Sequence, residues 1–195
     1  LKAKAVRGKE FVDNRNERGF NELRGYFIDE GGFLSSMDQP AEVSVLEQGP
    51  LFVKVAVKGK IGKYSFTQTI RLTQGEPRID MSVKLDWIGS PRIGEPGIEF
   101  RADNPRKSFY DDRYKLLVYL PIQIANQQIY KDAPFDVCES RLENTFFNRW
   151  DSIKHNIILN WVDVASKDNS CGLSLFTDHT TSYAPVSYTH LRAHE

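Results

Sequence analysis

The stretch that decides the fold runs from Val43 to Trp87 and reads VSVLEQGPLFVKVAVKGKIGKYSFTQTIRLTQGEPRIDMSVKLDW. Between Leu51 and Val57 every second residue is aliphatic, while Lys54 and Lys58 fall on the opposite face. This period of two is typical of a half-buried antiparallel strand. The alternation returns twice, and turn residues interrupt it at 48–50, 59–62 and 74–77. The stretch therefore predicts a β-meander, which is an architecture and not yet an activity.

The remaining alternating segments extend this prediction to the whole chain. They lie at 114–123, around 129 and 135–137, at 155–164 and at 172–177. Seven to ten short strands joined by Gly and Pro turns predict an all-β fold, an antiparallel β-sandwich. The segment 88–112 is too irregular for a strand and too broken for a helix, so we expect a long loop, whose role stays open.

Composition excludes some classes of partner. The 195 residues suffice for one substantial domain, and 26 basic residues balance 26 acidic ones, so no net charge favours nucleic acid or an anionic membrane. No window approaches the roughly 20 apolar residues of a membrane span, and we expect a soluble globular domain. Cys138 and Cys171 fit one disulfide as well as two buried free thiols. Because the chain opens at Leu1 and its true N-terminus is expected to be missing, the compartment stays unknown.

Several short motifs follow one another along the chain in a fixed order. They are Glu47-Gln48-Gly49-Pro50-Leu51, Gln68-Thr69-Ile70-Arg71-Leu72, Arg78-Ile79-Asp80, Asp86-Trp87, Lys115-Leu116-Leu117, Leu120-Pro121, Pro134-Phe135-Asp136-Val137 and Glu139-Ser140-Arg141. In their residues and their order these motifs resemble the C-terminal β-domain of glycoside hydrolase family 38, the α-mannosidases. The resemblance runs from about Phe20 to Ala184. It implies a β-sandwich of the galactose-mutarotase-like kind, a supersandwich.

The resemblance also implies that catalysis belongs to a different domain of the enzyme. In such enzymes an N-terminal catalytic domain holds the zinc, the nucleophilic aspartate and the acid/base carboxylate, and hydrolyses terminal α-linked mannose with retention. None of its motifs occurs here, so zinc is expected in that absent domain and no catalytic residue or metal ligand is carried over. Residues 1–184 are expected to be an incomplete, non-catalytic C-terminal β-sandwich domain. It would pack on the catalytic domain of the same chain and help to shape the pocket for the α-mannoside substrate.

An alternative from another class shares only the fold: a free-standing carbohydrate-binding or structural β-sandwich module. The upstream reading frame separates the two, because a zinc-binding α/β domain directly before Leu1 supports the mannosidase fragment.

The acidic residues of the chain do not form an obvious catalytic pair. Retaining glycosidases need two carboxylates roughly 5 Å apart. Asp136 and Glu139 are close in sequence, but beside a turn we expect them to be solvated, and Asp178 with His179 is expected to be a surface pair. We therefore expect no mannosidase activity and no stoichiometric zinc in the isolated chain.

Arg141 is the one residue to which the resemblance gives a place near substrate. Family members carry a similar short strand that leads to an arginine near the catalytic domain, so Arg141 is expected to face the sugar pocket. Its guanidinium would donate paired hydrogen bonds to substrate hydroxyls or hold a catalytic-domain carboxylate. The alternative is a surface arginine paired with Glu139 or Glu143.

The last eleven residues, 185–195, break the preceding pattern. They look like translated sequencing-adapter read-through, so we predict a non-native tail without ordered contacts and a domain truncated after Ala184. His190 and His194 have the i, i+4 spacing of a helical metal pair, but without a third ligand no metal site is expected there.

Overall fold

The computed structural model describes residues 10–94, 114–139, 156–178, 182–185 and 190–194. Apart from the short 3-10 helix η1 (Ile28–Glu30), the elements of the described residues are strands. They are β1 (Glu22–Phe27), β2 (Gly32–Ser35), β3 (Glu42–Gln48), β4 (Phe52–Ile61), β5 (Tyr64–Thr73), β6 (Ile79–Asp86), β7 (Leu117–Pro121), β8 (Gln127–Ala133), β9 (Asp136–Glu139), β10 (Asn156–Ile157), β11 (Trp161–Ser166), β12 (Gly172–Phe176), β13 (Ser182–Pro185) and β14 (His190–His194). No helix in the described part is long and apolar enough to cross a membrane.

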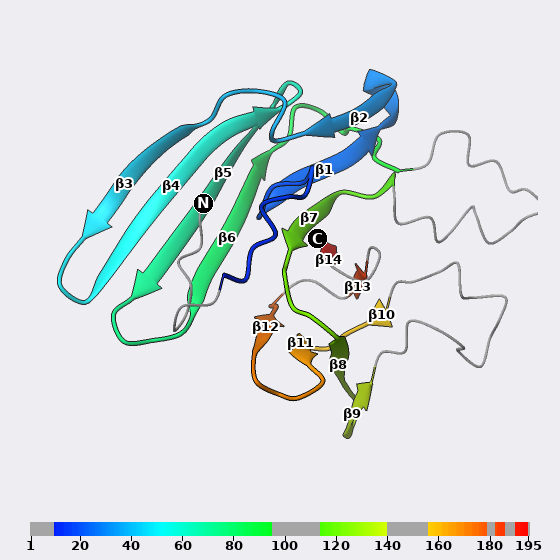
Figure 1. Cartoon of the computed structure of the whole chain (residues 1–195). Helices are drawn as coiled ribbons and strands as arrows, with labels where there is room; N and C mark the ends of the chain where they lie inside the picture. The colour runs from blue at the N-terminus through cyan, green and yellow to red at the C-terminus, as the bar shows by residue number, and fades with distance from the viewer. Residues whose placement is uncertain (1–9, 95–113, 140–155, 179–181, 186–189, 195) are drawn as a thin grey trace, which may run out of the picture.

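The strands form three antiparallel sheets, which confirms the predicted all-β sandwich class (Figure 1). One sheet is the meander β3-β4-β5-β6, and a second has the order β10-β13-β14-β7-β1-β2. The third has the order β12-β11-β8-β9. Each described strand pairing is antiparallel.

The predicted meander is present, and its register separates two faces. Cross-strand neighbours share a face of the sheet. One face has the rows Val43-Val57-Gln68-Val83, Val45-Val55-Ile70-Met81 and Gln48-Val53-Leu72-Ile79. The other has the rows Glu42-Lys58-Thr67-Lys84, Ser44-Ala56-Thr69-Ser82 and Glu47-Lys54-Arg71-Asp80. The sheet is therefore apolar on one side and mainly polar on the other.

Two buried clusters join the sheets. In the first, Leu23 and Phe27 of β1 pack against Ile61, Tyr64 and Phe66 of the meander. The second lies between β7, with the segment that follows it, and the third sheet; its buried members are Leu120, Ile122, Ile124, Ile129, Ile158, Val162 and Val164. The β1–β7 region thus contributes to both cores.

The end of the chain differs from the tail prediction in one respect. The backbone of β14 pairs with β7 through residues 117–121 and with β13 through residues 183–185. The predicted absence of ordered contacts is therefore wrong for 190–194, because the free edge of β7 offers backbone donors and acceptors that an extended segment satisfies. His190 and His194 lie on a strand and not on a helix. That residues 185–195 are non-native stays a prediction.

The predicted loop 88–112 begins with ordered backbone. Ile93 forms an isolated bridge with Phe27, and the Gly94 amide donates to the Tyr26 carbonyl at 3.0 Å. Residues 95–113 lie outside the described part of the chain.

Candidate functional site: an apolar groove on the meander

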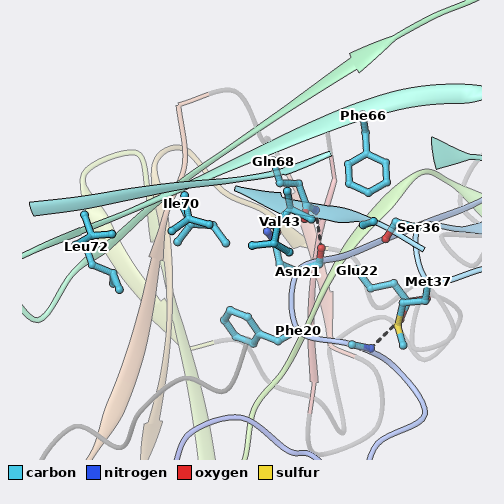
Figure 2. A pocket seen from close by; sticks show the side chains of 15 residues that line it. Phe20, Asn21, Glu22, Ser36, Met37, Val43, Phe66, Gln68, Ile70 and Leu72 are labelled. Carbon is cyan, nitrogen blue, oxygen red and sulfur yellow. Dashed lines mark hydrogen bonds between the residues drawn. The ribbon is translucent and has the colours of Figure 1, made fainter. Parts of the chain in front are cut away.

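The apolar face of the meander forms one wall of a groove of about 450 Å³. The opposite wall comes from the segment that enters β1 and the turn after β2. Figure 2 shows Phe20 and Met37 across the groove from Ile70 and Leu72. The lining residues are Gly19, Phe20, Asn21, Glu22, Ser36, Met37, Ala41, Val43, Val53, Val55, Val57, Phe66, Gln68, Ile70 and Leu72. A concave, mainly apolar surface with a few polar groups is the usual form of a binding site.

Burial changes along the groove. On β5 the inward side chains from Tyr64 to Ile70 are buried, whereas Leu72 is 47% exposed. On the edge strand β3, Val43 is 67% exposed. The closed end of the groove therefore continues the core that joins the meander to β1, and the open end meets solvent.

Glu22 is the only ionisable residue among those that line the groove, and its carboxylate already has hydrogen-bond and ion-pair partners within the chain. It accepts hydrogen bonds from the Ser35 hydroxyl at 2.7 Å and the Gly19 amide at 2.9 Å, and Arg18 lies 3.6 Å away. Glu22 is 2% exposed, so these partners offset the cost of burying its charge. Glu22 holds the 19–22 turn against β2 and is not placed as a free acid or base.

Asn21 is the polar residue that the groove leaves unsatisfied. Its φ of 65° lies in the left-handed region, which Asn tolerates better than most residues. Its backbone is fixed at both ends, because its amide donates to the Tyr119 carbonyl at 2.8 Å and its carbonyl accepts from Gln68 Nε2 at 2.7 Å (Figure 2). The side-chain nitrogen Nδ2 is buried without a hydrogen-bond partner. Such a donor costs about 1–3 kcal/mol when unpaired, so it favours an added acceptor.

The groove is thus suited to binding an apolar surface, and its side chains do not supply a catalytic pair. Among the residues that the structure describes, no group of three or more His, Cys, Asp or Glu side chains could hold a metal ion.

The residues that the sequence singled out lie elsewhere. Asp136 and Glu139 are the first and last residues of β9 and are exposed; three positions apart on a strand, they point to opposite faces. They do not converge as a catalytic pair. Arg141 and His179 lie outside the described residues, so the predicted place of Arg141 at the sugar pocket stays a prediction.

The two cysteines are free and do not form a disulfide. Cys138 lies in β9 and Cys171 directly precedes β12, which are the opposite edges of one sheet. Three strand spacings of about 4.8 Å separate those edges by roughly 14 Å. A disulfide needs Cα atoms within about 7 Å, so this sheet order keeps the thiols apart.

Sequence reasoning did not find the groove wall of residues 19–22. Its position depends on contacts with Tyr119 and Gln68, which are distant in sequence, and no local motif encodes them. The available local signal was the presence of Gly19 and Asn21 two residues apart, since Gly and Asn favour turns.

The chain matches a known protein family. The family model described as "Glycosyl hydrolases family 38 C-terminal domain" matches residues 26–192, which is most of the chain. A search of curated proteins gave no match.

Proposed function

Since the chain belongs to the glycosyl hydrolase family 38 C-terminal domain family, we propose that it is the non-catalytic C-terminal β-domain of a retaining, zinc-dependent α-mannosidase. The complete enzyme would hydrolyse terminal α-linked mannose. The family match over residues 26–192 is the observation that carries this proposal. The antiparallel sheets and the mainly apolar groove are consistent with a domain that packs against another.

The proposal assigns the zinc and both catalytic carboxylates to an N-terminal catalytic domain, as the family resemblance implies. The described residues of this chain do not fit a zinc site, because no three of their His, Cys, Asp or Glu side chains lie close enough together to hold a metal ion. This domain would therefore contribute to binding and support, and no chemical step is assigned to it.

Near the substrate, the proposal gives this domain one polar contact. Arg141 would face the sugar pocket of the assembled enzyme and donate charge-assisted hydrogen bonds to a hydroxyl or to a catalytic-domain carboxylate.

The test is to recover the full-length gene and to express the whole enzyme beside residues 1–195. We expect the whole enzyme to turn over an aryl α-mannoside much faster than the matching α-glucoside. The anomeric NMR signal of the first product should be that of α-mannose, which shows retention of configuration. Residues 1–195 alone should be inactive. Turnover by residues 1–195 that a point mutation within them abolishes would contradict the non-catalytic role. A gene without any preceding catalytic domain would instead favour a free-standing module.

A further inference from the structure

We propose that the outer edge of β7 is a strand-acceptor site, which binds an extended polypeptide segment antiparallel to β7 through the backbone of Val118 and Leu120. In this chain residues 190–194, which form β14, occupy the site. Recognition is by backbone atoms, so an extended segment of another sequence can take the place of β14. The inference is independent of the proposed mannosidase activity.

The hydrogen bonds on the β1 side of β7 show which of its residues face outward. The Tyr119 carbonyl accepts from the Asn21 amide at 2.8 Å, directly before β1. The Pro121 carbonyl accepts at 3.2 Å from an amide of the segment that leads into β1. The backbone groups of successive strand residues point alternately to the two neighbouring strands. Val118 and Leu120 therefore direct their N–H and C=O groups to the outer edge, where β14 lies.

The register of β14 fits these outward groups. Leu191 is paired with Leu120, and Ala193 with Val118. In an antiparallel ladder, paired residues that face each other in this way exchange both of their backbone hydrogen bonds. Arg192 lies between the two pairs and directs its backbone to the other neighbour, β13. Two amides and two carbonyls of β7 thus define the site.

The two prolines of this part of the sheet support the assignment. A proline has no amide hydrogen, so a sheet tolerates it only where no ladder bond needs that hydrogen. Pro121 of β7 directs its backbone toward the β1 side. Pro185 of β13 is paired with Leu191, whose backbone faces β7 instead. Both prolines therefore stand at positions whose missing amide is not used by β14.

The chemistry of the site identifies its occupant as a polypeptide. The side chains of Leu117 and Leu120 are buried, and backbone groups beside such side chains are almost always paired. Outward N–H and C=O groups that recur every second residue are complementary to the backbone of another extended segment, as in strand addition. A hydrocarbon ligand offers no donor or acceptor for this row.

Occupancy of the site also determines how the last strands join the fold. Among the described strands, β10 and β13 are connected to β7 through β14. β14 is part of the same chain as β7, and a short tether gives an effective concentration in the millimolar range. A peptide added in trans therefore binds well only when β14 no longer pairs with β7.

The test uses the whole chain of 195 residues and a fluorescein-labelled peptide with the sequence of residues 186–195. The double variant Leu191→Pro/Ala193→Pro removes the two β14 amides that face β7. The matched control Arg192→Pro removes an amide that faces β13. Fluorescence anisotropy measures peptide binding. We expect the double variant to bind the peptide at least ~10-fold more tightly than the control variant or the unmodified chain, because its own segment has lost two hydrogen bonds to the site.

Two further peptides test what the site recognises. A peptide with the same residues in shuffled order should bind the double variant as tightly as the original. A peptide that carries proline in place of Leu191 and Ala193 should bind at least ~10-fold more weakly. Equal binding to the double variant and the unmodified chain would overturn the site, and weak binding of the shuffled peptide would overturn its recognition by backbone.

Hydrogen exchange in the unmodified chain gives a second measurement that needs no substitution, and circular dichroism checks the fold of each variant. The amides of Val118 and Leu120 should be protected as strongly as those of Leu117 and Tyr119, which are paired with β1. Rapid exchange at Val118 and Leu120 would overturn the inference even where the double variant does not fold.

Discussion

Asp132 ties the end of β8 to the start of β11. Its carboxylate accepts from the backbone amides of Leu159, Asn160 and Trp161 at 2.9, 2.6 and 3.2 Å, and from the Asn160 side chain at 2.9 Å. Burial acts to raise the pKa of Asp132, but the hydrogen bonds from Leu159, Trp161 and Asn160 outweigh it and hold this pKa below its usual value. The ionised carboxylate therefore stabilises the β8–β11 junction.

Replacing Asp132 with Ala is expected to lower the free energy of unfolding by about 1.5–3 kcal/mol, because three backbone amides lose a charged acceptor. Urea unfolding at neutral pH measures this. The control is Asp136→Ala on β9, since that exposed carboxylate accepts only from the adjacent Val137 amide among the bonds described for it. The control should change stability by no more than about 0.5 kcal/mol. Equal losses in both variants would contradict this role of Asp132.

The lowered pKa of Asp132 also predicts a pH dependence with a definite sign. A carboxyl group whose pKa is lower in the folded state contributes stability above its unfolded pKa of about 3.9, and loses that contribution as the pH falls through the folded pKa. The stability difference between the unmodified chain and Asp132→Asn should therefore be constant from pH 7 to 5 and shrink below about pH 3.9. Urea unfolding at several pH values tests this, and a difference that grows on acidification would contradict it.

Arg141 leads to a prediction about catalysis. In the full-length enzyme, Arg141→Ala should lower kcat/KM by at least ~10-fold, because the loss of one charge-assisted hydrogen bond costs roughly 1.5–3 kcal/mol. Arg141→Lys should recover only part of the loss, since Lys cannot donate in a bidentate way. Steady-state kinetics with an aryl α-mannoside, beside a circular dichroism check of the fold, give the answer. Unchanged kinetics would make Arg141 a surface residue.

The strands of the meander were predictable because their pattern is local. Alternation at 51–57, 66–72 and 79–85 and the turn residues between these segments fix β4, β5 and β6 without distant contacts. The apolar face of the meander was predictable in the same way. Which part of it is covered was not, because burial depends on where β1 crosses the meander, and β1 is positioned by pairing with β7 about a hundred residues later. The groove was missed for this reason.

Gly59 illustrates how two paired strands fit together. It is paired with Phe66, and an added Cβ at Gly59 would lie 2.8 Å from the Phe66 ring and 3.2 Å from Ala41. Gly59→Ala is therefore expected to lower the free energy of unfolding by about 1–3 kcal/mol through overpacking. The control is Gly32→Ala in β2, where nothing lies within 4 Å of the added carbon. Thermal and urea unfolding measure both, and a neutral Gly59→Ala would show that the ring moves freely aside.

The arrangement of the three sheets explains why the two halves of the chain depend on each other. The sheet that contains β1 and β7 shares one core with the meander and another with the β8–β11 sheet. Val118 of β7 packs against both cores. Loss of β1–β7 pairing would therefore weaken both interfaces at once, whereas Val43, at the exposed edge of the meander, belongs to neither core.

This independence predicts that a charge is tolerated at the exposed edge of the meander's apolar face but not at its buried centre. In residues 1–195 alone, Val43→Lys should change the free energy of unfolding by no more than about 0.5 kcal/mol, because Val43 is 67% exposed. The matched change Ile70→Lys on the same face should lower the free energy of unfolding by at least about 1–3 kcal/mol, because Ile70 is 3% exposed and an unpaired charge would be buried there. For a domain of this size that corresponds to a Tm about 2–4 °C lower for each kcal/mol. Differential scanning calorimetry of both variants of residues 1–195, with Ser44→Lys as the control on the opposite face, measures the contrast. Equal losses of Tm in Val43→Lys and Ile70→Lys would mean that the edge of this face around Val43 is packed as closely as its centre.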